Sequence, residues 1–367
     1  MKILGIETSC DETAAAVVEL HQDGPGAKLL SNVVASSMDL HAKYGGIVPE
    51  IAARSHIEAI LPVITEALET ANSTWEDIDA IAVTYGAGLG GSLLIGVLTA
   101  RTLAIAHQKP LYAINHVEGH VYANFITETS LPGYQLLSAI PSFPMLAVIL
   151  SGKHSQLVIF RNHFDYTLLG ETFDDAIGEA FDKVAKMLGL PYPGGPSVAK
   201  AAADGNPAAY KLPKAKMGKY DFSFSGLKTA VLRLAQAEIG ESYDFPSTKL
   251  PERLSGVQKA NIAASFQRVA IETIVDKAKL AYEEFNPKSV VIAGGVAASQ
   301  ELRRQLTEAL PRLSGRQDGQ ALPIEYPDIK LCTDNGAMIA TLACFKAMMG
   351  QPLADPYTLD IVTNLSM

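Results

Sequence analysis

The sequence predicts an α/β protein of two similar lobes, and two observations support this prediction. The first is a hairpin pattern that occurs twice: residues 2–20 and residues 145–160 each contain an apolar strand, a polar turn and a second apolar strand. Such a unit recurring about 140 residues along the chain indicates a duplicated lobe. The second observation is the alternation of strand and helix patterns along the rest of the chain.

Repeated hairpins followed by further strands and helices fit two ribonuclease-H-like lobes better than one doubly wound sheet. A parallel sheet connects its strands by crossovers, so it accommodates hairpins poorly. We expect the first lobe to comprise residues 1–140 together with 334–367, and the second lobe to comprise residues 141–333.

Apolar periodicity and turn residues define the remaining elements. After the first hairpin the predicted order is a strand at 28–36, a helix at 49–71, a strand at 79–85, a helix at 90–107, a strand at 111–114 and a helix from 116. After the second hairpin it is helices at 174–188, 225–238 and 256–284, a strand at 289–293, a helix at 297–310, a strand at 323–327 and a helix from 335. Gly189 and the turn PYPGGP end the first of these helices, and the polar stretch 312–322 is expected to be an exposed loop.

Composition limits the classes of protein to which the chain can belong. Of its 367 residues 48% are hydrophobic and 19% are charged, which favours a large folded core over disorder. Its three cysteines stand far apart, which argues against a cysteine-rich zinc site and for a reducing compartment. The sequence contains no recognisable signal peptide and no apolar run of about 18 residues, so we expect a cytoplasmic protein without a membrane span. Because the net charge is −9, any contact with nucleic acid would use a local basic patch or a partner.

Two histidines with helical spacing are the first candidates for chemistry. In the segment NHVEGH, His116 and His120 fall on one face of a helix, at a spacing that suits two metal ligands. Asp334, in the segment CTDNG before an apolar helix, is a candidate third ligand, although a helix N-cap explains it as well. Two imidazoles and one carboxylate suit iron or zinc and leave coordination positions open. Glu118 points about 200° away from the first histidine on a helix, which disfavours a metalloprotease.

The turns of the two hairpins are the second group of candidates. The first turn carries Asp11 and Glu12, and the second has the sequence SGKHS, in which backbone N–H groups and Lys153 can cradle a phosphate. Ordinary serine and glycine turns explain each of them separately. Asp182 lies on the polar side of the helix at 174–188, where it is either a solvated side chain or a ligand of ribose hydroxyls.

A cationic segment is the third candidate. Lys214, Lys216 and Lys219 lie in the stretch KLPKAKMGKYDFSFSGLKTAV, where aromatic residues stand between and after the lysines. On an acidic protein this is the best candidate for an RNA-facing patch, and an ordinary lysine-bearing surface loop is the alternative.

Long strings of the sequence resemble the TsaD family, in fixed order over nearly the whole chain. They are LGIETSCDET, YGGIVPEIAARSH, GLGGSLLIG, NHVEGH, ILSGKHSQL, GEAFDKVAKMLGL, YPGGP, FSFSGLKTAV, IAGGVAAS and TDNGAMIA. The resemblance implies the fold of the actin, sugar kinase and heat-shock ATPase-like superfamily. It also implies transfer of a threonylcarbamoyl group from L-threonylcarbamoyl-adenylate to N6 of adenosine 37, in tRNAs reading codons that begin with A, with release of AMP.

The same resemblance assigns roles to individual residues. It implies one divalent ion, Fe²⁺ or Zn²⁺, on His116, His120 and Asp334. It places the donor against eight residues: Ile149, Leu150, Ser151, Gly152, Lys153, Asp182, Gly195 and Ser299. Two of these depart from the family pattern, because Lys153 stands where a glycine is usual and Ser299 where an asparagine is usual. The implied partners are tRNA, a shorter inactive paralogue (TsaB-like) and a P-loop ATPase (TsaE-like).

The donor is already an activated anhydride, so the expected chemistry needs positioning and no covalent enzyme intermediate. Asp11 or Glu12 is hypothesised to orient the N6 amine or to accept its proton. The competing interpretations are an ATP-dependent small-molecule kinase of the same superfamily and a degenerate scaffold, and a metalloprotease ranks last. A kinase would hold magnesium through oxygen atoms and water.

Overall fold

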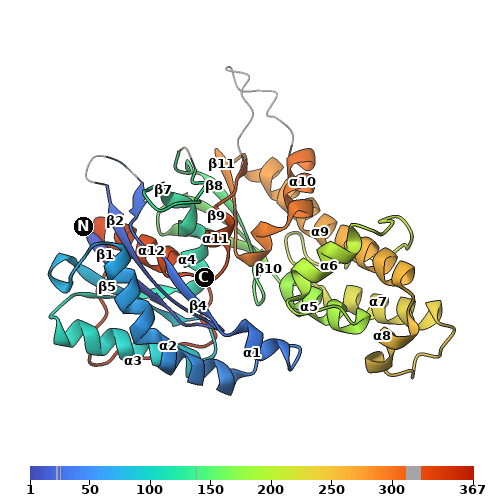
Figure 1. Ribbon diagram of the computed structural model, residues 1–367. Coiled ribbons are helices and arrows are strands. Elements are labelled where there is room, and N and C mark those ends of the chain that lie inside the picture. The colour runs from blue at the N-terminus through green and yellow to red at the C-terminus, as the bar shows by residue number, and fades with distance from the viewer. Residues whose placement is uncertain (22–23, 25, 138, 311–323) are drawn as a thin grey trace. The chain divides into compact units, whose positions relative to one another are not determined.

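The computed structural model describes residues 1–21, 24, 26–137, 139–310 and 324–367 (Figure 1). The chain divides into two compact units, one of Met1–Ser142 with Glu325–Met367 and one of Phe143–Ile324. The expected loop at 312–322 lies outside the described residues.

The first unit is built on a mixed sheet whose central strand is β1. Its strands are β1 (Lys2–Glu7), β2 (Glu12–Leu20), β3 (Ala27–Leu29), β4 (Val33–Ser36), β5 (Ala80–Gly86), β6 (Leu111–Asn115) and β7 (Ile126–Thr129). The order is β6-β5-β1-β2-β3-β7, with β4 also pairing with β2. The hairpin β1–β2 is antiparallel, whereas β5 and β6 continue the sheet parallel to β1.

Helices cover both faces of this first sheet (Figure 1). They are α1 (Met38–Ala42), α2 (Pro49–Thr70), α3 (Gly90–Ala106), α4 (His116–Tyr122), α11 (Ile329–Cys332) and α12 (Gly336–Met348). Successive strand residues point to opposite faces, so Leu4 and Ile6 pack in a core with α2. Gly5 lies on the other face, where an added Cβ would be 2.5 Å from the backbone N of Ala340 in α12.

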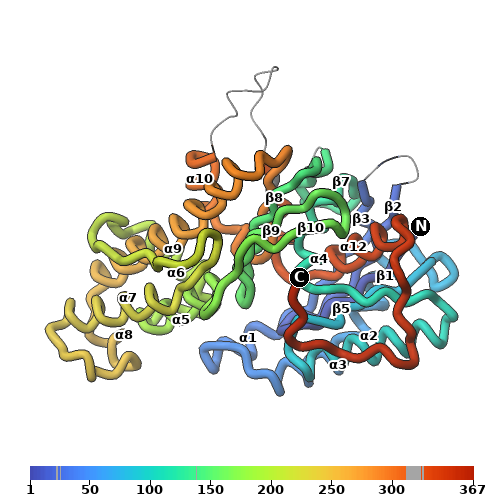
Figure 2. Tube along the Cα trace, turned by 180° about the vertical axis from the view of Figure 1, so that it is seen from behind, coloured from blue at the N-terminus to red at the C-terminus, as the bar shows by residue number. Residues whose placement is uncertain are grey.

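The C-terminal segment after α12 is extended and runs along the first unit (Figure 2). The guanidinium of Arg101 in α3 donates hydrogen bonds to the carbonyls of Pro356, Tyr357 and Leu359. Near its end, the Ser366 carbonyl accepts a hydrogen bond from the side-chain amide of Asn115 at 3.0 Å. The chain end is therefore tied to the strand that precedes α4.

The second unit repeats the strand order of the first. Its strands are β8 (Met145–Leu150), β9 (Ser155–Asn162), β10 (Asp165–Glu171), β11 (Ser289–Ala293) and β12 (Ile324–Glu325), where the chain passes back to the first unit. The order is β10-β9-β8-β11-β12. Strands β8, β9 and β10 form an antiparallel meander, and β11 pairs parallel with β8. The first unit has the same arrangement in β3-β2-β1-β5, where β5 pairs parallel with β1. This is the duplicated ribonuclease-H-like pattern that the two hairpins predict.

The helices of the second unit pack mainly around the long helix α9. They are α5 (Ile177–Leu188), α6 (Gly194–Ala202), α7 (Ser225–Glu238), α8 (Leu250–Arg253), α9 (Gly256–Phe285) and α10 (Gln300–Ala309). Ser255 and Gln258 form a capping box at the start of α9, and Asn286 ends it in the left-handed conformation. Short 3-10 turns complete the fold at Trp75–Asp77, Ala123–Phe125, Ser247–Lys249 and Gly295–Ala298.

Most predicted elements are confirmed. The helix expected at 297–310 begins later, at Gln300, because a 3-10 turn at Gly295–Ala298 precedes it, and three other elements differ for local reasons. The strand expected at 28–36 is divided into β3 and β4, and between them the Ser31 hydroxyl accepts a hydrogen bond from the backbone N of Val17. The helix expected from 174 begins at Ile177, because the Thr172 hydroxyl binds the Asp175 carbonyl in a turn before it. The PYPGGP segment was expected to be only a turn, yet α6 begins inside it.

Candidate active site

Helix α4 presents its two histidines on one side. The side chain of Asn115, at the end of β6, accepts hydrogen bonds from the backbone N atoms of Val117 (2.9 Å) and Glu118 (3.4 Å) and so caps the helix. The helix therefore begins at His116, and the four-residue spacing brings His120 beside it, with ring centroids 4.7 Å apart. Both imidazoles are buried.

Asp334 completes the group from a distant part of the sequence. The N-cap of α12 is the neighbouring Asn335, whose side chain accepts a hydrogen bond from Met338 N, so the capping role considered for Asp334 is wrong. One carboxylate oxygen of Asp334 lies 3.2 Å from Nε2 of His120 and 3.5 Å from Nε2 of His116. The ligand atoms of all three side chains lie within 4.8 Å of one another.

The three side chains fit a metal ion. Two ligands, each about 2.0–2.1 Å from a tetrahedral ion, lie about 3.3 Å apart, which matches the two separations from Asp334. Moreover, both ring nitrogens of His120 are buried without a hydrogen-bond partner among the described residues. A buried polar atom normally has a partner, so this arrangement could hold an ion.

Glu118 takes no part in this group. Burial raises the pKa of its carboxyl to about 7, and the positive charge of Lys346 in α12 opposes this rise. Lys346 is half-buried and donates a hydrogen bond to the carbonyl of Ala113. Glu118 therefore interacts with Lys346 and not with the group of His116, His120 and Asp334, which agrees with the expectation that it does not act as a base on the metal.

The turn of the first hairpin lies beside the histidines. The hydroxyl of Ser9 is 3.1 Å from Nδ1 of His116, and the Ser9 carbonyl accepts a hydrogen bond from Leu89 N. His56, on the buried side of α2, binds the Thr13 hydroxyl through Nδ1 (2.8 Å) and the Cys10 carbonyl through Nε2 (3.0 Å). The sequence analysis gave His56 no role, although its place on the apolar face of a predicted helix was a signal.

Asp11 and Glu12 occupy this turn. Asp11 is buried and Glu12 is half-buried. Burial, together with the nearby carboxylates of Asp334 and Asp11, raises the pKa of Glu12 to about 10. Glu12 is therefore within electrostatic range of both Asp11 and Asp334 in the first unit.

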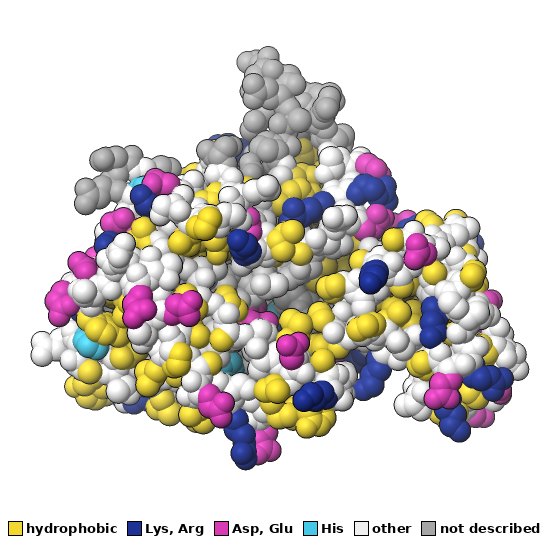
Figure 3. Space-filling view, viewed as in Figure 1, with side chains coloured by type: hydrophobic (Ala, Val, Ile, Leu, Met, Phe, Trp, Pro, Cys, Tyr) yellow, Lys and Arg dark blue, Asp and Glu magenta, His cyan; other side chains and the backbone are white. Residues whose placement is uncertain are grey.

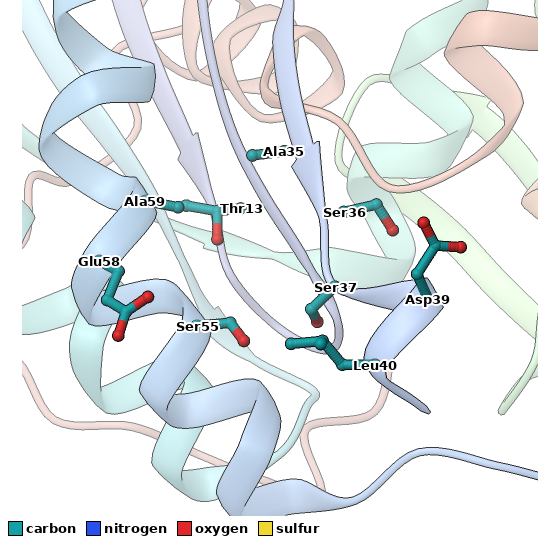
Figure 4. Close-up of a pocket in the computed structure, with 9 residues that line it drawn as sticks. All are labelled: Thr13, Ala35, Ser36, Ser37, Asp39, Leu40, Ser55, Glu58 and Ala59. Carbon is teal, nitrogen blue, oxygen red and sulfur yellow. The ribbon is translucent and has the colours of Figure 1, made fainter. Parts of the chain in front are cut away.

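A surface pocket lies behind the same turn (Figure 4). Thr13 of β2, Ser55 and Glu58 of α2, and Asp39 of α1 contribute to its lining. The pocket is rich in hydroxyl groups and carries two carboxylates, and the sequence analysis did not predict it.

The turn of the second hairpin is tight and packs against the start of helix α5. The Ser151 hydroxyl accepts hydrogen bonds from the backbone N atoms of Lys153 and His154 at 3.3 and 3.0 Å. An added Cβ at Gly178, in the first turn of α5, would lie 2.7 Å from the Ser151 carbonyl oxygen, so α5 packs directly on this turn. Gly152 faces open space.

The other predicted donor residues of the second unit have different surroundings. Ile149 and Leu150 are fully buried strand residues, so only their backbone could meet a ligand. Asp182 accepts a hydrogen bond from Gly194 N at 2.6 Å, whereas Gly195 faces open space. The Ser299 hydroxyl caps α10 by accepting from Leu302 N.

Comparison with known proteins identifies the family. The family model described as "TsaD: tRNA N6-adenosine threonylcarbamoyltransferase" matches residues 28–341. The chain belongs to the TsaD family. A tRNA N6-adenosine threonylcarbamoyltransferase of Thermomicrobium roseum is 48% identical to this TsaD-family chain over 358 residues, which cover 95% of this chain and 93% of that protein. A protein of the same name from Dehalococcoides mccartyi is 45% identical over 368 residues, 100% of this chain and 99% of that protein.

The fold of this TsaD-family member also occurs in a distant protein of known structure. Full-length HypF in its phosphate- and nucleotide-bound form matches with a TM-score of 0.53 and 14% identity, over 96% of this chain and 47% of that one. The predicted α/β fold with two lobes of similar strand order is confirmed. In the described part of the chain, no helix is long and apolar enough to cross a membrane.

The lysine segment of this TsaD-family chain packs against α9. Lys214 forms ion pairs with Asp276 (2.6 Å) and Glu272 (3.3 Å), and Lys219 pairs with Glu284. Lys216 is exposed. Carboxylates therefore offset part of the positive charge that the sequence places here.

Proposed function

We propose that this TsaD-family enzyme transfers the threonylcarbamoyl group from L-threonylcarbamoyl-adenylate to N6 of adenosine 37, in tRNAs reading codons that begin with A, and releases AMP. The observation that carries this proposal is the identity of 45–48% over nearly the full length to proteins named tRNA N6-adenosine threonylcarbamoyltransferase. The kinase alternative is not favoured, because two imidazoles are poor ligands for the magnesium of a kinase.

The deciding experiment is an assay of AMP release from threonylcarbamoyl-adenylate with purified protein and tRNA. AMP should appear only when the tRNA carries adenosine 37, and a tRNA with guanosine at that position is the matched control. If instead the protein phosphorylates a metabolite with ATP and ignores the tRNA, the kinase interpretation is correct. The assay should be run with and without the TsaB-like and TsaE-like partners.

We further propose that His116, His120 and Asp334 hold one Fe²⁺ or Zn²⁺ ion. Such an ion, when bound, supplies positive charge and open coordination positions for the oxygen atoms of an activated nucleotide. His120→Ala should lower the metal content of the purified protein, while His107→Ala, a change in a histidine outside this group, should leave it unchanged. Equal metal content in all three proteins would refute the site.

Asp11 and Glu12 are proposed to orient the N6 amine of the acceptor. The electrostatic interaction of Glu12 with Asp334 and Asp11 supports this role, and because N6 is a poor nucleophile, orientation has a large effect on rate. Single-turnover transfer should slow by about tenfold or more in Asp11→Ala or Glu12→Ala. Unchanged rates in both variants would eliminate the role.

In the second unit we propose that the turn Ser151–Lys153 contacts the phosphate of the donor, with Asp182, Gly195 and Ser299 around the nucleoside. The open space at Gly152 and Gly195 supports an approach of a ligand to the backbone there. Lys153→Gly restores the residue usual in the family. It should raise KM for the donor and leave the single-turnover rate nearly unchanged, if Lys153 contributes only charge to binding.

The outer face of α2 and α3 is our proposed surface for the TsaB-like paralogue. Ile57 and Leu61 of α2 are each 61% exposed, and Leu94 and Leu98 of α3 are also exposed. Figure 3 shows apolar side chains among charged ones over this part of the first unit. Leu61→Asp should abolish complex formation without changing the melting temperature, since the side chain faces solvent in the free chain.

We place the tRNA on the Lys214, Lys216 and Lys219 segment, and the reaction in the cytoplasm.

A further inference from the structure

A buried carboxylate lies behind the first histidine of the metal group. Glu7 is the last residue of β1 and is fully buried. One of its oxygens accepts a hydrogen bond from the backbone N of Ser9, and the other accepts from the Thr84 hydroxyl at 2.6 Å. That second oxygen also lies 3.0 Å from Nδ1 of His116. A carboxylate buried in an apolar sheet is costly unless it is hydrogen-bonded, and here both oxygens are bonded.

The contact with Glu7 decides which nitrogen of His116 carries the proton. An ionised carboxylate only accepts hydrogen bonds, so the nitrogen facing it carries the hydrogen. Nδ1 of His116 therefore donates, and Nε2 keeps its lone pair. Nε2 is the atom of His116 that lies 3.5 Å from Asp334, on the side where the ligand atoms converge.

The second histidine has no such support. Neither ring nitrogen of His120 has a hydrogen-bond partner among the described residues. The two imidazoles therefore differ, because His116 has a carboxylate at Nδ1, the nitrogen other than the one that faces Asp334, whereas the carboxylate contact of His120 is the one between its Nε2 and Asp334 at 3.2 Å.

We infer that Glu7 is a positioning residue that holds His116 as the Nδ1–H tautomer, with Nε2 presented to the metal ion. The inference rests on the proposed metal site and adds a residue to which the sequence analysis gave no role. A carboxylate behind a ligating histidine orients the ring and increases its basicity, and removing such a partner typically lowers metal affinity by about 10–100-fold.

The test uses Glu7→Gln, which keeps the size of the side chain. A glutamine has one acceptor oxygen and one donor nitrogen, whereas the protein offers the Ser9 N–H on one side and the Thr84 hydroxyl with the His116 N–H on the other. The amide satisfies both sides only with its nitrogen toward Thr84 and His116, which requires an unprotonated Nδ1 on His116 and moves the ring proton to Nε2, the nitrogen that faces Asp334. The dissociation constant for Zn²⁺, measured by competition with a chelating dye, should rise by about 10–100-fold. Thr84→Val, which leaves the Glu7–His116 contact in place, should change it much less.

A second measurement reads the tautomer without metal or tRNA. In metal-free protein labelled with ¹⁵N-histidine, long-range ¹H–¹⁵N spectra should show His116 protonated at Nδ1, with the signal assigned by its loss in His116→Gln. In Glu7→Gln this signature should disappear. If Glu7→Gln does not fold, the wild-type and Thr84→Val spectra still test the inference, because both should show the Nδ1–H form.

Two results would overturn the inference. One is a wild-type spectrum in which His116 is protonated at Nε2, and the other is a folded Glu7→Gln protein whose Zn²⁺ affinity lies within about twofold of wild type. Failure of the proposed metal site looks different. In that case the wild-type protein binds no Zn²⁺, while the tautomer measurement still gives its own answer about Glu7.

Discussion

Helix α12 begins so close to the sheet of the first unit that a single methyl group at its start should disturb the proposed metal site at His116, His120 and Asp334. An added Cβ at Gly336 would lie 2.5 Å from the backbone N of Ala16 and 2.6 Å from the carbonyl carbon of Ala15, both in β2. An ordinary contact is 3.4 Å or longer, so Gly336→Ala requires a shift of about 0.9 Å. Because β2 is held on both sides in the sheet, the start of the helix should move instead.

This shift is large compared with the tolerance of the site. Asp334 is two residues before Gly336, and its carboxylate lies 3.2 Å from Nε2 of His120. Metal–ligand distances are fixed within about 0.2 Å, so a displacement approaching 1 Å should remove one ligand. We expect Zn²⁺ affinity to fall by at least about tenfold, which corresponds to about 1.4 kcal/mol. Overpacking should also lower the free energy of unfolding by about 1–3 kcal/mol.

The matched control is Gly256→Ala, the same substitution at the first residue of another helix. Nothing lies within 4 Å of an added Cβ there, so the free energy of unfolding should stay constant or rise by up to about 1 kcal/mol. Zn²⁺ affinity by dye competition and urea unfolding are measured on both variants. The reasoning is refuted if Gly336→Ala binds Zn²⁺ as tightly as the wild type and unfolds at the same urea concentration.

Three further predictions concern other parts of the chain. Arg101→Lys keeps the charge but cannot donate to three carbonyls at once, so it should lower the free energy of unfolding by about 1–3 kcal/mol and speed proteolytic removal of the C-terminal segment. Burial lowers the pKa of His163 from 6.5 to about 4, so the native state favours the neutral ring. The stability that the neutral His163 ring contributes is therefore complete above pH 6.5 and is lost as the pH falls toward 4. His163→Phe, which keeps a ring against Phe143, should make unfolding in urea less dependent on pH in that window; an equal dependence would contradict the assignment. His56→Phe removes both bonds to the first hairpin turn and should slow single-turnover transfer by about tenfold or more with little change in fold, as judged by circular dichroism.

Features that depend on local periodicity were predictable from the sequence. Both hairpins, the helix at 225–238 and the strand at 289–293 follow from patterns of a few residues repeated along one segment. The closeness of His116 and His120 follows from the helical repeat alone. Local rules thus account for two of the three side chains in the group of His116, His120 and Asp334.

Features that depend on distant contacts were not predictable in this way. Helix α6 begins where Asp182, on the preceding helix, binds Gly194 N, and the PYPGGP string contains no trace of that bond. Lys214 and Lys219 looked like a free basic patch, because their carboxylate partners lie in α9, some 60 residues further along the chain. Glu7 was visible as an acidic residue at the end of an apolar strand pattern, but its role depends on His116, which lies 109 residues away.

The shared strand order explains why the chemistry of the two units can differ on one fold. In the first unit Glu7, Thr84 and Asn115 all lie at the carboxyl ends of the parallel strands β1, β5 and β6, which meet at one edge of the sheet. In the second unit the equivalent edge, at the ends of β8 and β11, has Leu150 and Gly294 in contact and presents backbone and a serine–glycine turn. Open α/β sheets bind ligands at this edge, beyond the core. A duplicated lobe can therefore replace imidazole and carboxylate by backbone N–H groups there without repacking its interior, which is the difference between the metal site that we propose for the first unit and the phosphate-binding turn that we propose for the second.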